Sequence, residues 1–133
     1  MGNDNNAQQI QTVTIGDNEY TLLYNFAALA DAEKRTGRKI MDLCNDAMAG
    51  SLSVTELAKM FMAGLEAGRK NSGRLGKPIR EDRAFQLMGK AGFAATATWV
   101  YDGIAEVLGY DPDEDADDSE NPEVGSPGTG KIS

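Results

Sequence analysis

The sequence of 133 residues predicts a mainly α-helical protein, in which an N-terminal β-hairpin precedes about five helices and a disordered acidic C-terminal tail. Three observations support this prediction. Apolar and polar residues alternate only near the N-terminus, as in strands, whereas apolar residues further along recur at helical spacing. Asparagine, serine and glycine residues stand where the predicted helices begin and end. Acidic residues are concentrated at the C-terminus.

The alternating segment predicts a hairpin over residues 11–24. Val13 and Ile15 fall on one face of the first strand, and Gly16-Asp17-Asn18 supplies a short turn. The alternation resumes after the turn at Tyr20, Leu22 and Tyr24. An isolated two-stranded hairpin is only marginally stable in water, so we expect this one to pack against the helices.

Two short helices are predicted to follow the hairpin. The side chain of Asn25 can accept a hydrogen bond from the first helical turn, so the first helix is expected to begin at Phe26. Gly37 is suited to the left-handed conformation that ends a helix. The second helix is predicted over residues 39–49, and Gly50 is expected to stop it.

A capping box marks the start of the third helix. In the segment Ser53-Val54-Thr55-Glu56, the serine can bind the third helical amide while the glutamate binds back to the serine amide. Apolar residues then recur with the helical period at Leu57, Met60, Phe61 and Leu65. We expect Gly68 to end this helix.

The last third of the domain is predicted to contain a loop and two more helices. Residues 69–78 form a basic segment with glycines, which is typical of a loop. Pro78 is suited to the first turn of the fourth helix, which is expected to end near Gly89 or Gly92. The fifth helix is predicted over residues 93–108.

Charge and composition divide the chain into three parts. Residues 111–133 hold eight acidic residues against Lys131 and few large apolar residues, so this segment is expected to be disordered. Residues 1–9 are polar and are expected to form a flexible arm. The remaining residues, 10–110, are predicted to fold as one α-rich domain.

The composition argues against several classes of function. The chain has no histidine, which excludes histidine-based catalysis and histidine-ligated metals. We identify no catalytic residue, metal site or cofactor site, and expect a non-enzymatic protein. The single Cys44 leaves no intrachain disulfide and is expected in the core. The net charge of −8 argues against nucleic-acid binding, and no apolar run could span a membrane, so a cytoplasmic location is expected.

Two groups of residues are candidates for binding a partner protein. Basic residues cluster after the third helix, where they fit a docking surface for an acidic partner; a solvated surface and contact with the chain's own acidic tail are the alternatives. Apolar residues of the third helix form the second group. The methionines fit either core packing or an adaptable binding surface. The candidate residues are Met60, Phe61, Leu65, Arg69, Lys70, Arg74, Lys77 and Arg80.

Short motifs along the chain resemble those of a known family. They are TVTIGDNEYTL at 12–22, YNFAALADAE at 24–33, TGRKI at 36–40, LSVTEL at 52–57 and FMAGL at 61–65. In this order they are similar to the tail assembly chaperones of long-tailed bacteriophages and gene transfer agents. The resemblance extends over about residues 12–109 and is strongest in its first half.

The resemblance implies a non-catalytic role in tail morphogenesis. Such chaperones bind the tape measure protein in the host cytoplasm and are absent from the mature virion. The tail tube protein is a further candidate partner, and homo-oligomerisation is left open. Many members also have a longer form made by ribosomal frameshifting, for which the codons of Gly130-Lys131 are a candidate site.

Two other classes of function are kept as alternatives. The first is a virion structural component, such as a tail tube or connector subunit, which would be present in purified particles. The second is a small DNA-binding module, which is supported only by the basic cluster and would show a steep loss of affinity with salt.

Overall fold

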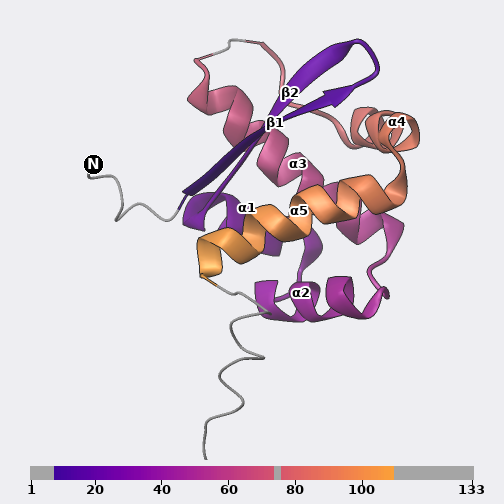
Figure 1. Cartoon of the computed structure of the whole chain (residues 1–133). Coiled ribbons are helices and arrows are strands. Elements are labelled where there is room, and N and C mark those ends of the chain that lie inside the picture. Colours follow the sequence, from indigo (N-terminus) through magenta and orange to yellow (C-terminus); the bar gives the residue numbers. More distant parts are fainter. Residues whose placement is uncertain (1–7, 74–75, 110–133) are drawn as a thin grey trace, which may run out of the picture.

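The computed structural model of the chain describes residues 8–73 and 76–109, and Figure 1 shows how their elements are arranged. The predicted hairpin and the five helices that follow it are confirmed. The elements are β1 (Gln8–Ile15), β2 (Asn18–Asn25), α1 (Phe26–Thr36), α2 (Ile40–Ala49), α3 (Val54–Asn71), α4 (Glu81–Ala91) and α5 (Phe93–Leu108). The predicted tail, and the frameshift site within it, lie outside the described residues.

The two strands form an antiparallel hairpin closed by a two-residue turn. Ile15 pairs with Asn18, so Gly16 and Asp17 make the turn, and Gly16 has the positive φ of 64° that such a turn requires. The strand β1 begins earlier than predicted, because Gln8 pairs with Asn25. Two residues assigned to the flexible arm 1–9 therefore belong to the strand, and residues 1–7 are outside the described part.

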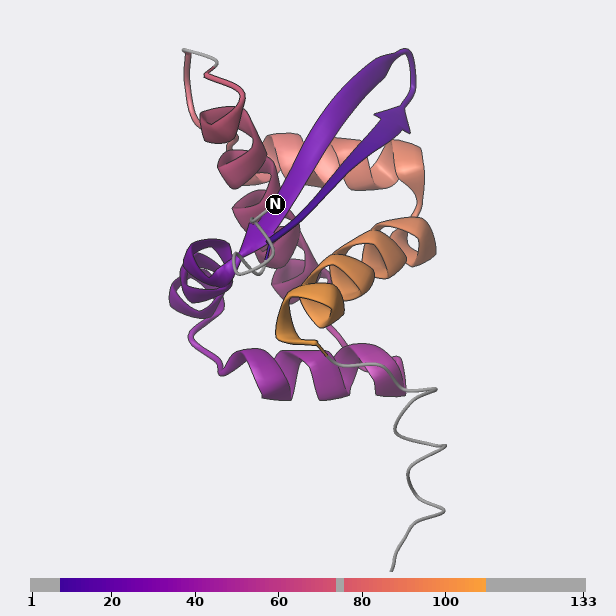
Figure 2. The ribbon, with the colours of Figure 1, turned by 60° about the vertical axis from the view of Figure 1, so that its left-hand side comes forward.

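The helix α3 is the centre of the fold. It packs against β2, α1, α4 and α5, while α2 closes the end of the domain by packing on α1 and α5. Figures 1 and 2 show the hairpin tip extending away from the end of the domain that α2 covers. None of the described helices is long and apolar enough to cross a membrane.

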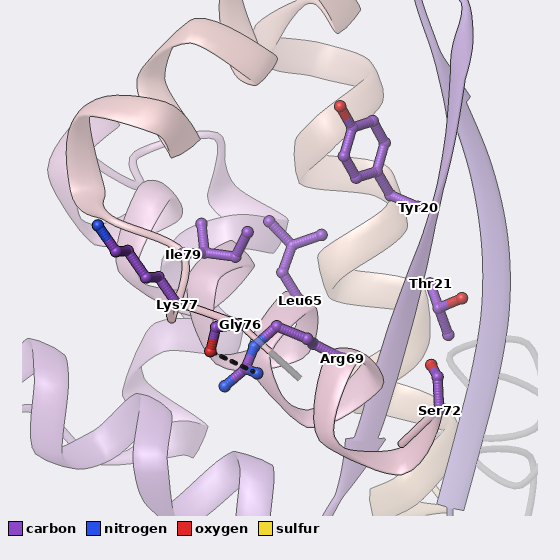
Figure 3. A pocket seen from close by; sticks show the side chains of 8 residues that line it. All are labelled: Tyr20, Thr21, Leu65, Arg69, Ser72, Gly76, Lys77 and Ile79. Carbon is purple, nitrogen blue, oxygen red and sulfur yellow. Dashed lines mark hydrogen bonds between the residues drawn. The ribbon is translucent and has the colours of Figure 1, made fainter. Parts of the chain in front are cut away.

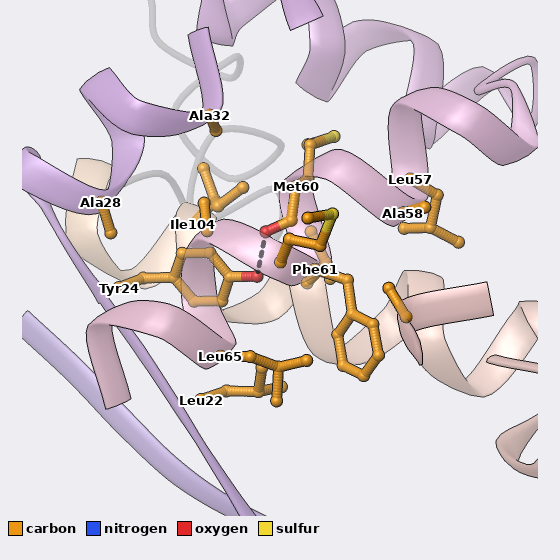
Figure 4. Packing of buried hydrophobic residues seen from close by; sticks show 14 of the residues in the cluster. Leu22, Tyr24, Ala28, Ala32, Leu57, Ala58, Met60, Phe61, Leu65 and Ile104 are labelled. Atoms are coloured by element: carbon orange, nitrogen blue, oxygen red, sulfur yellow. Dashed lines mark hydrogen bonds between the residues drawn. The ribbon is translucent and has the colours of Figure 1, made fainter. Parts of the chain in front are cut away.

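The core is organised around the ring of Tyr24, which is completely buried (Figure 4). Its hydroxyl donates a hydrogen bond of 2.9 Å to the backbone oxygen of Met60. Two helix glycines let α3 and α5 approach the ring, because a Cβ added at Gly64 would lie 2.5 Å from its Cζ and one added at Gly103 would lie 2.6 Å from its Cδ2. The aromatic ring therefore fixes the distance between β2 and both helices.

The predicted helix ends are confirmed where local side chains decide them. The Asn25 side chain accepts a hydrogen bond of 2.9 Å from the amide of Ala28, and both hydrogen bonds of the Ser53–Glu56 capping box are present. Gly37 adopts the left-handed conformation at the end of α1, as Gly50 does at the end of α2.

Two predicted helix boundaries in the second half of the domain are wrong. The helix α3 does not end at Gly68 but continues to Asn71, because Gly68 faces β2: an added Cβ would collide with the carbonyl oxygen of Thr21. Its lack of a side chain allows close packing rather than a helix end. The helix α4 begins at Glu81 and not at Pro78. The connection between α3 and α4 is therefore residues 72–80, which is shifted toward the C-terminus from the predicted 69–78.

Candidate functional site

The candidate site is a groove of about 180 Å³ beside the hairpin, which we call the basic groove. Its walls are β2 and, more than forty positions later in the sequence, the C-terminal half of α3 with its cap residue Ser72, followed by the extended chain that leads to α4 (Figure 3). The residues that line it are Tyr20, Thr21, Leu65, Arg69, Ser72, Gly76, Lys77 and Ile79.

A buried carboxylate holds two of these walls together. Glu66, 4% exposed, accepts hydrogen bonds from the guanidinium of Arg69 at 2.8 and 3.1 Å and from the backbone amide of Ile79 at 2.6 Å. The Arg69 guanidinium is the main cause that lowers the pKa of the Glu66 carboxyl, although burial opposes this. Arg69 also donates to the backbone oxygen of Gly76 at 3.4 Å. The extended chain is thereby fixed against α3.

The groove combines an apolar floor with a polar and basic rim. The partly exposed Ile79 provides most of the apolar surface, with Leu65, which is only 4% exposed, beneath it, and Ser72 and the exposed Lys77 lie at the rim. The hydroxyl of Tyr20 accepts a hydrogen bond of 3.1 Å from the guanidinium of Arg83, which brings a further positive charge beside the groove. This arrangement suits a partner side chain with an apolar stem and an acidic end.

The structure brings some of the predicted partner-binding residues together. Leu65, Arg69 and Lys77 line the basic groove, although Arg69 is ion-paired with Glu66. Lys70 and Arg80 are exposed outside its lining, and Arg80 lies 3.5 Å from Asp82. Arg74 is not among the described residues.

Two of the predicted partner-binding residues are reassigned to the core. Met60 is 1% exposed and Phe61 is 0% exposed, and a side chain enclosed by its own fold offers no surface to a partner. The other lining residues, Tyr20, Thr21, Ser72, Gly76 and Ile79, are not predicted from the sequence. No local pattern marks them, because they face the groove only after α3 has packed along β2. The spacing of Glu66 and Arg69 on one helix could have revealed their ion pair.

A second, apolar hollow of about 60 Å³ lies between α2 and α5. Its lining residues are Met41, Cys44, Asn45, Met48, Tyr101, Ala105 and Leu108. Met41 and Met48 are about half exposed, at 51% and 54%, while Met60, Met62 and Met88 are buried. The core-packing prediction is therefore confirmed for Met60, Met62 and Met88, and Met41 and Met48 are exposed. Cys44 is buried as predicted, and burial raises the pKa of its thiol, which disfavours the reactive thiolate.

The described residues contain no group of three or more histidine, cysteine, aspartate or glutamate side chains that could hold a metal ion. The two hollows differ in their lining. The basic groove has an apolar floor with basic residues, and the hollow between α2 and α5 has exposed methionines.

Comparison with known proteins places this domain in a family. A family model described as phage tail tube protein, GTA-gp10, matches residues 10–100, which run from β1 into α5. No curated protein and no solved structure was found to match the chain. Because the match covers more than half of the chain, the protein belongs to the family described as phage tail tube protein, GTA-gp10, and is a tail protein of a phage or gene transfer agent.

Proposed function

We propose that this tail protein is a tail assembly chaperone, which binds the tape measure protein during tail morphogenesis and is absent from the finished particle. Its membership of a phage tail family supports a role in tail structure or assembly. The resemblance of its motifs to tail assembly chaperones supports the narrower function.

The basic groove is the observation that carries the proposal. A chaperone must hold a partner segment and release it later, so its site should be small, open and partly polar rather than a large apolar interface. The groove has these properties, because its apolar floor of Leu65 and Ile79 lies beside the exposed amine of Lys77. An amphipathic helix of the tape measure protein could place one apolar and one acidic side chain there.

The exposed methionines add a second contact surface to the proposal. Met41 and Met48 lie on α2 at the apolar hollow. Methionine side chains are flexible and adapt to partners of different shape, which suits a protein that binds a long and varied chain.

A virion structural component, such as a tail tube subunit, is the second candidate function. The description of the matched family, phage tail tube protein, favours it. Such a subunit would remain in the particle, whereas a chaperone would leave it.

Three further parts of the proposal follow from the chaperone role. The protein acts without catalysis, which the absence of histidine supports. It works in the host cytoplasm. A longer form is made by frameshifting at the codons of Gly130-Lys131, so an immunoblot of producing cells should show two bands that share the N-terminal domain.

The experiment that separates the two candidate functions compares producing cells with purified particles. An antibody against this protein should detect it in the cell lysate, together with the tape measure protein after affinity capture, and should not detect it in particles. Detection in particles at a level comparable to a known tail subunit would refute the chaperone proposal and favour the structural one.

The role of the basic groove is tested with a matched pair of charge reversals. Lys77→Glu places an acidic side chain at the groove and should weaken capture of the co-expressed tape measure protein. Lys34→Glu makes the same change at an exposed lysine of α1 that does not line the groove and should leave capture unchanged. Equal capture by both variants would exclude the groove as the binding site.

A further inference from the structure

The two edges of the hairpin differ in what covers them. The outer edge of β2 is covered by α3, since Gly68 packs directly on the carbonyl group of Thr21. The helices α5 and α4 contact β1, and the Gln11 side chain donates a hydrogen bond to the backbone oxygen of Trp99. On the face opposite the buried Val13 and Ile15, the side chains of Ile10 (47% exposed), Thr12 and Thr14 are exposed. The edge of β2 is therefore closed, whereas the edge of β1 is open in the sense that its outward backbone groups have no hydrogen-bond partner among the described residues.

The register identifies which backbone groups point outward from β1. In a hairpin closed by two residues, the flanking pair Ile15–Asn18 exchanges hydrogen bonds, and bonded and non-bonded pairs then alternate. Ile10, Thr12 and Thr14 occupy non-bonded pairs, so their amide and carbonyl groups face away from β2. Within residues 8–73 and 76–109, no hydrogen bond joins these outward groups to another element.

The strand β1 also lacks the features that usually keep an open edge from pairing. Proteins protect such edges with charged side chains, prolines or bulges. The strand QQIQTVTI contains no charged residue and no proline, and its eight residues pair with β2 without a break in register. Two copies of this strand can approach each other without bringing like charges together.

We propose that a second copy of this chain pairs with the open edge of β1, so that two hairpins form one four-stranded antiparallel sheet around a two-fold axis at Thr12. In this register Thr12 faces Thr12 of the other copy and Ile10 faces Thr14, and each of these pairs exchanges two backbone hydrogen bonds.

The side chains on the outer face fit this register. Thr12 is already opposite Thr21 within the hairpin, so the central row of the extended sheet would consist of four threonines, which pair well across strands. Each half-exposed Ile10 would gain the neighbouring Thr14 of the other copy as a packing partner. Glu19, which pairs with Thr14, would not meet an acidic residue across the axis.

The first test measures the association of the full chain by sedimentation velocity. The wild-type protein should be a dimer that dissociates on dilution. Thr12→Pro removes the outward amide without removing a hydrogen bond inside the hairpin, and should raise the dissociation constant by about tenfold or more. Thr12→Val keeps the amide and should dimerise like the wild type. Far-UV circular dichroism confirms that both variants are folded.

The second test examines the register, because a two-fold axis at Thr12 pairs this residue with itself. Thr12→Lys and Thr12→Glu should each dimerise less tightly, as like charges meet. An equal mixture of the two variants should recover a dimer that contains one copy of each. A monomeric wild-type protein, or a dimer that neither Thr12→Pro nor the single charges weaken, would overturn the proposal.

Discussion

Replacing Gly64 by alanine tests whether the Tyr24 ring holds the core together. The added Cβ would lie 2.5 Å from both Cζ and Oη of the tyrosine, well inside the closest contact that such atoms make. The ring has little room to move, because it is completely buried and its hydroxyl is hydrogen-bonded to the backbone oxygen of Met60. Gly103 of α5 packs against the ring at Cδ2. The substitution therefore forces the helix or the ring to move.

The expected loss of stability is the balance of two destabilising effects and one stabilising effect. Overpacking of this kind costs about 1–3 kcal/mol, and a weakened hydrogen bond to Met60 adds about 1 kcal/mol. Alanine in a helix interior recovers about 1 kcal/mol relative to glycine. Gly64→Ala should thus lower the free energy of unfolding by about 2 kcal/mol, which corresponds to roughly 10 °C in Tm for a domain of this size.

A matched control is available on α4. Gly89 is exposed, and nothing lies within 4 Å of an added Cβ. Gly89→Ala should raise the free energy of unfolding by about 0.5–1 kcal/mol, from helix propensity alone. Urea unfolding followed by circular dichroism measures both variants. If Gly64→Ala were as stable as the wild type or more stable, the close packing of α3 on Tyr24 would be refuted.

Three further substitutions test other parts of the structure. Glu66→Gln should lower the free energy of unfolding at neutral pH by about 2 kcal/mol. Because the folded-state pKa of Glu66 is lowered from 4.5, the wild type should lose this stabilisation as the pH falls below 4.5, and the difference in urea midpoint between the two proteins should shrink. Asn25→Ala removes the cap of α1 and should cost about 1 kcal/mol by thermal unfolding, whereas an unchanged Tm would contradict the cap. Phe61→Asp buries a carboxylate in the core and should leave the chain unfolded by circular dichroism; a native spectrum would show that Phe61 is not enclosed.

The parts of the fold that the sequence predicts correctly are those that neighbouring residues decide. Asn25 caps α1 with its own side chain, and Ser53 and Glu56 satisfy each other's amides, so short sequence patterns suffice. The hairpin follows from alternation and a glycine turn. The wrong boundary at Gly68 has a different cause, because a glycine in this position ends a helix by local rules and the contact with Thr21 overrides them.

The basic groove could be predicted only in part. The cluster of basic residues drew attention to Arg69 and Lys77, which do line it. The groove also needs β2, which lies more than forty positions before the α3 residues that line it. No spacing within β2 or within α3 indicates that the two elements meet there. The pattern does not distinguish the core residues Met60 and Phe61 from binding residues, because an apolar helical stripe looks the same whether a partner or the protein's own core covers it.

The position of Gly68 links the groove to the open edge of the hairpin. Because α3 continues past this glycine to Asn71, it carries Arg69 to the groove and lies against the outer edge of β2 at Thr21. A helix that ended at Gly68 would keep the cover of the strand but would not carry Arg69 to the groove. With β2 closed, a further strand can add to the sheet only at β1. Two copies that pair through their single open edges leave no edge free, so this pairing closes as a dimer and cannot extend into a fibre.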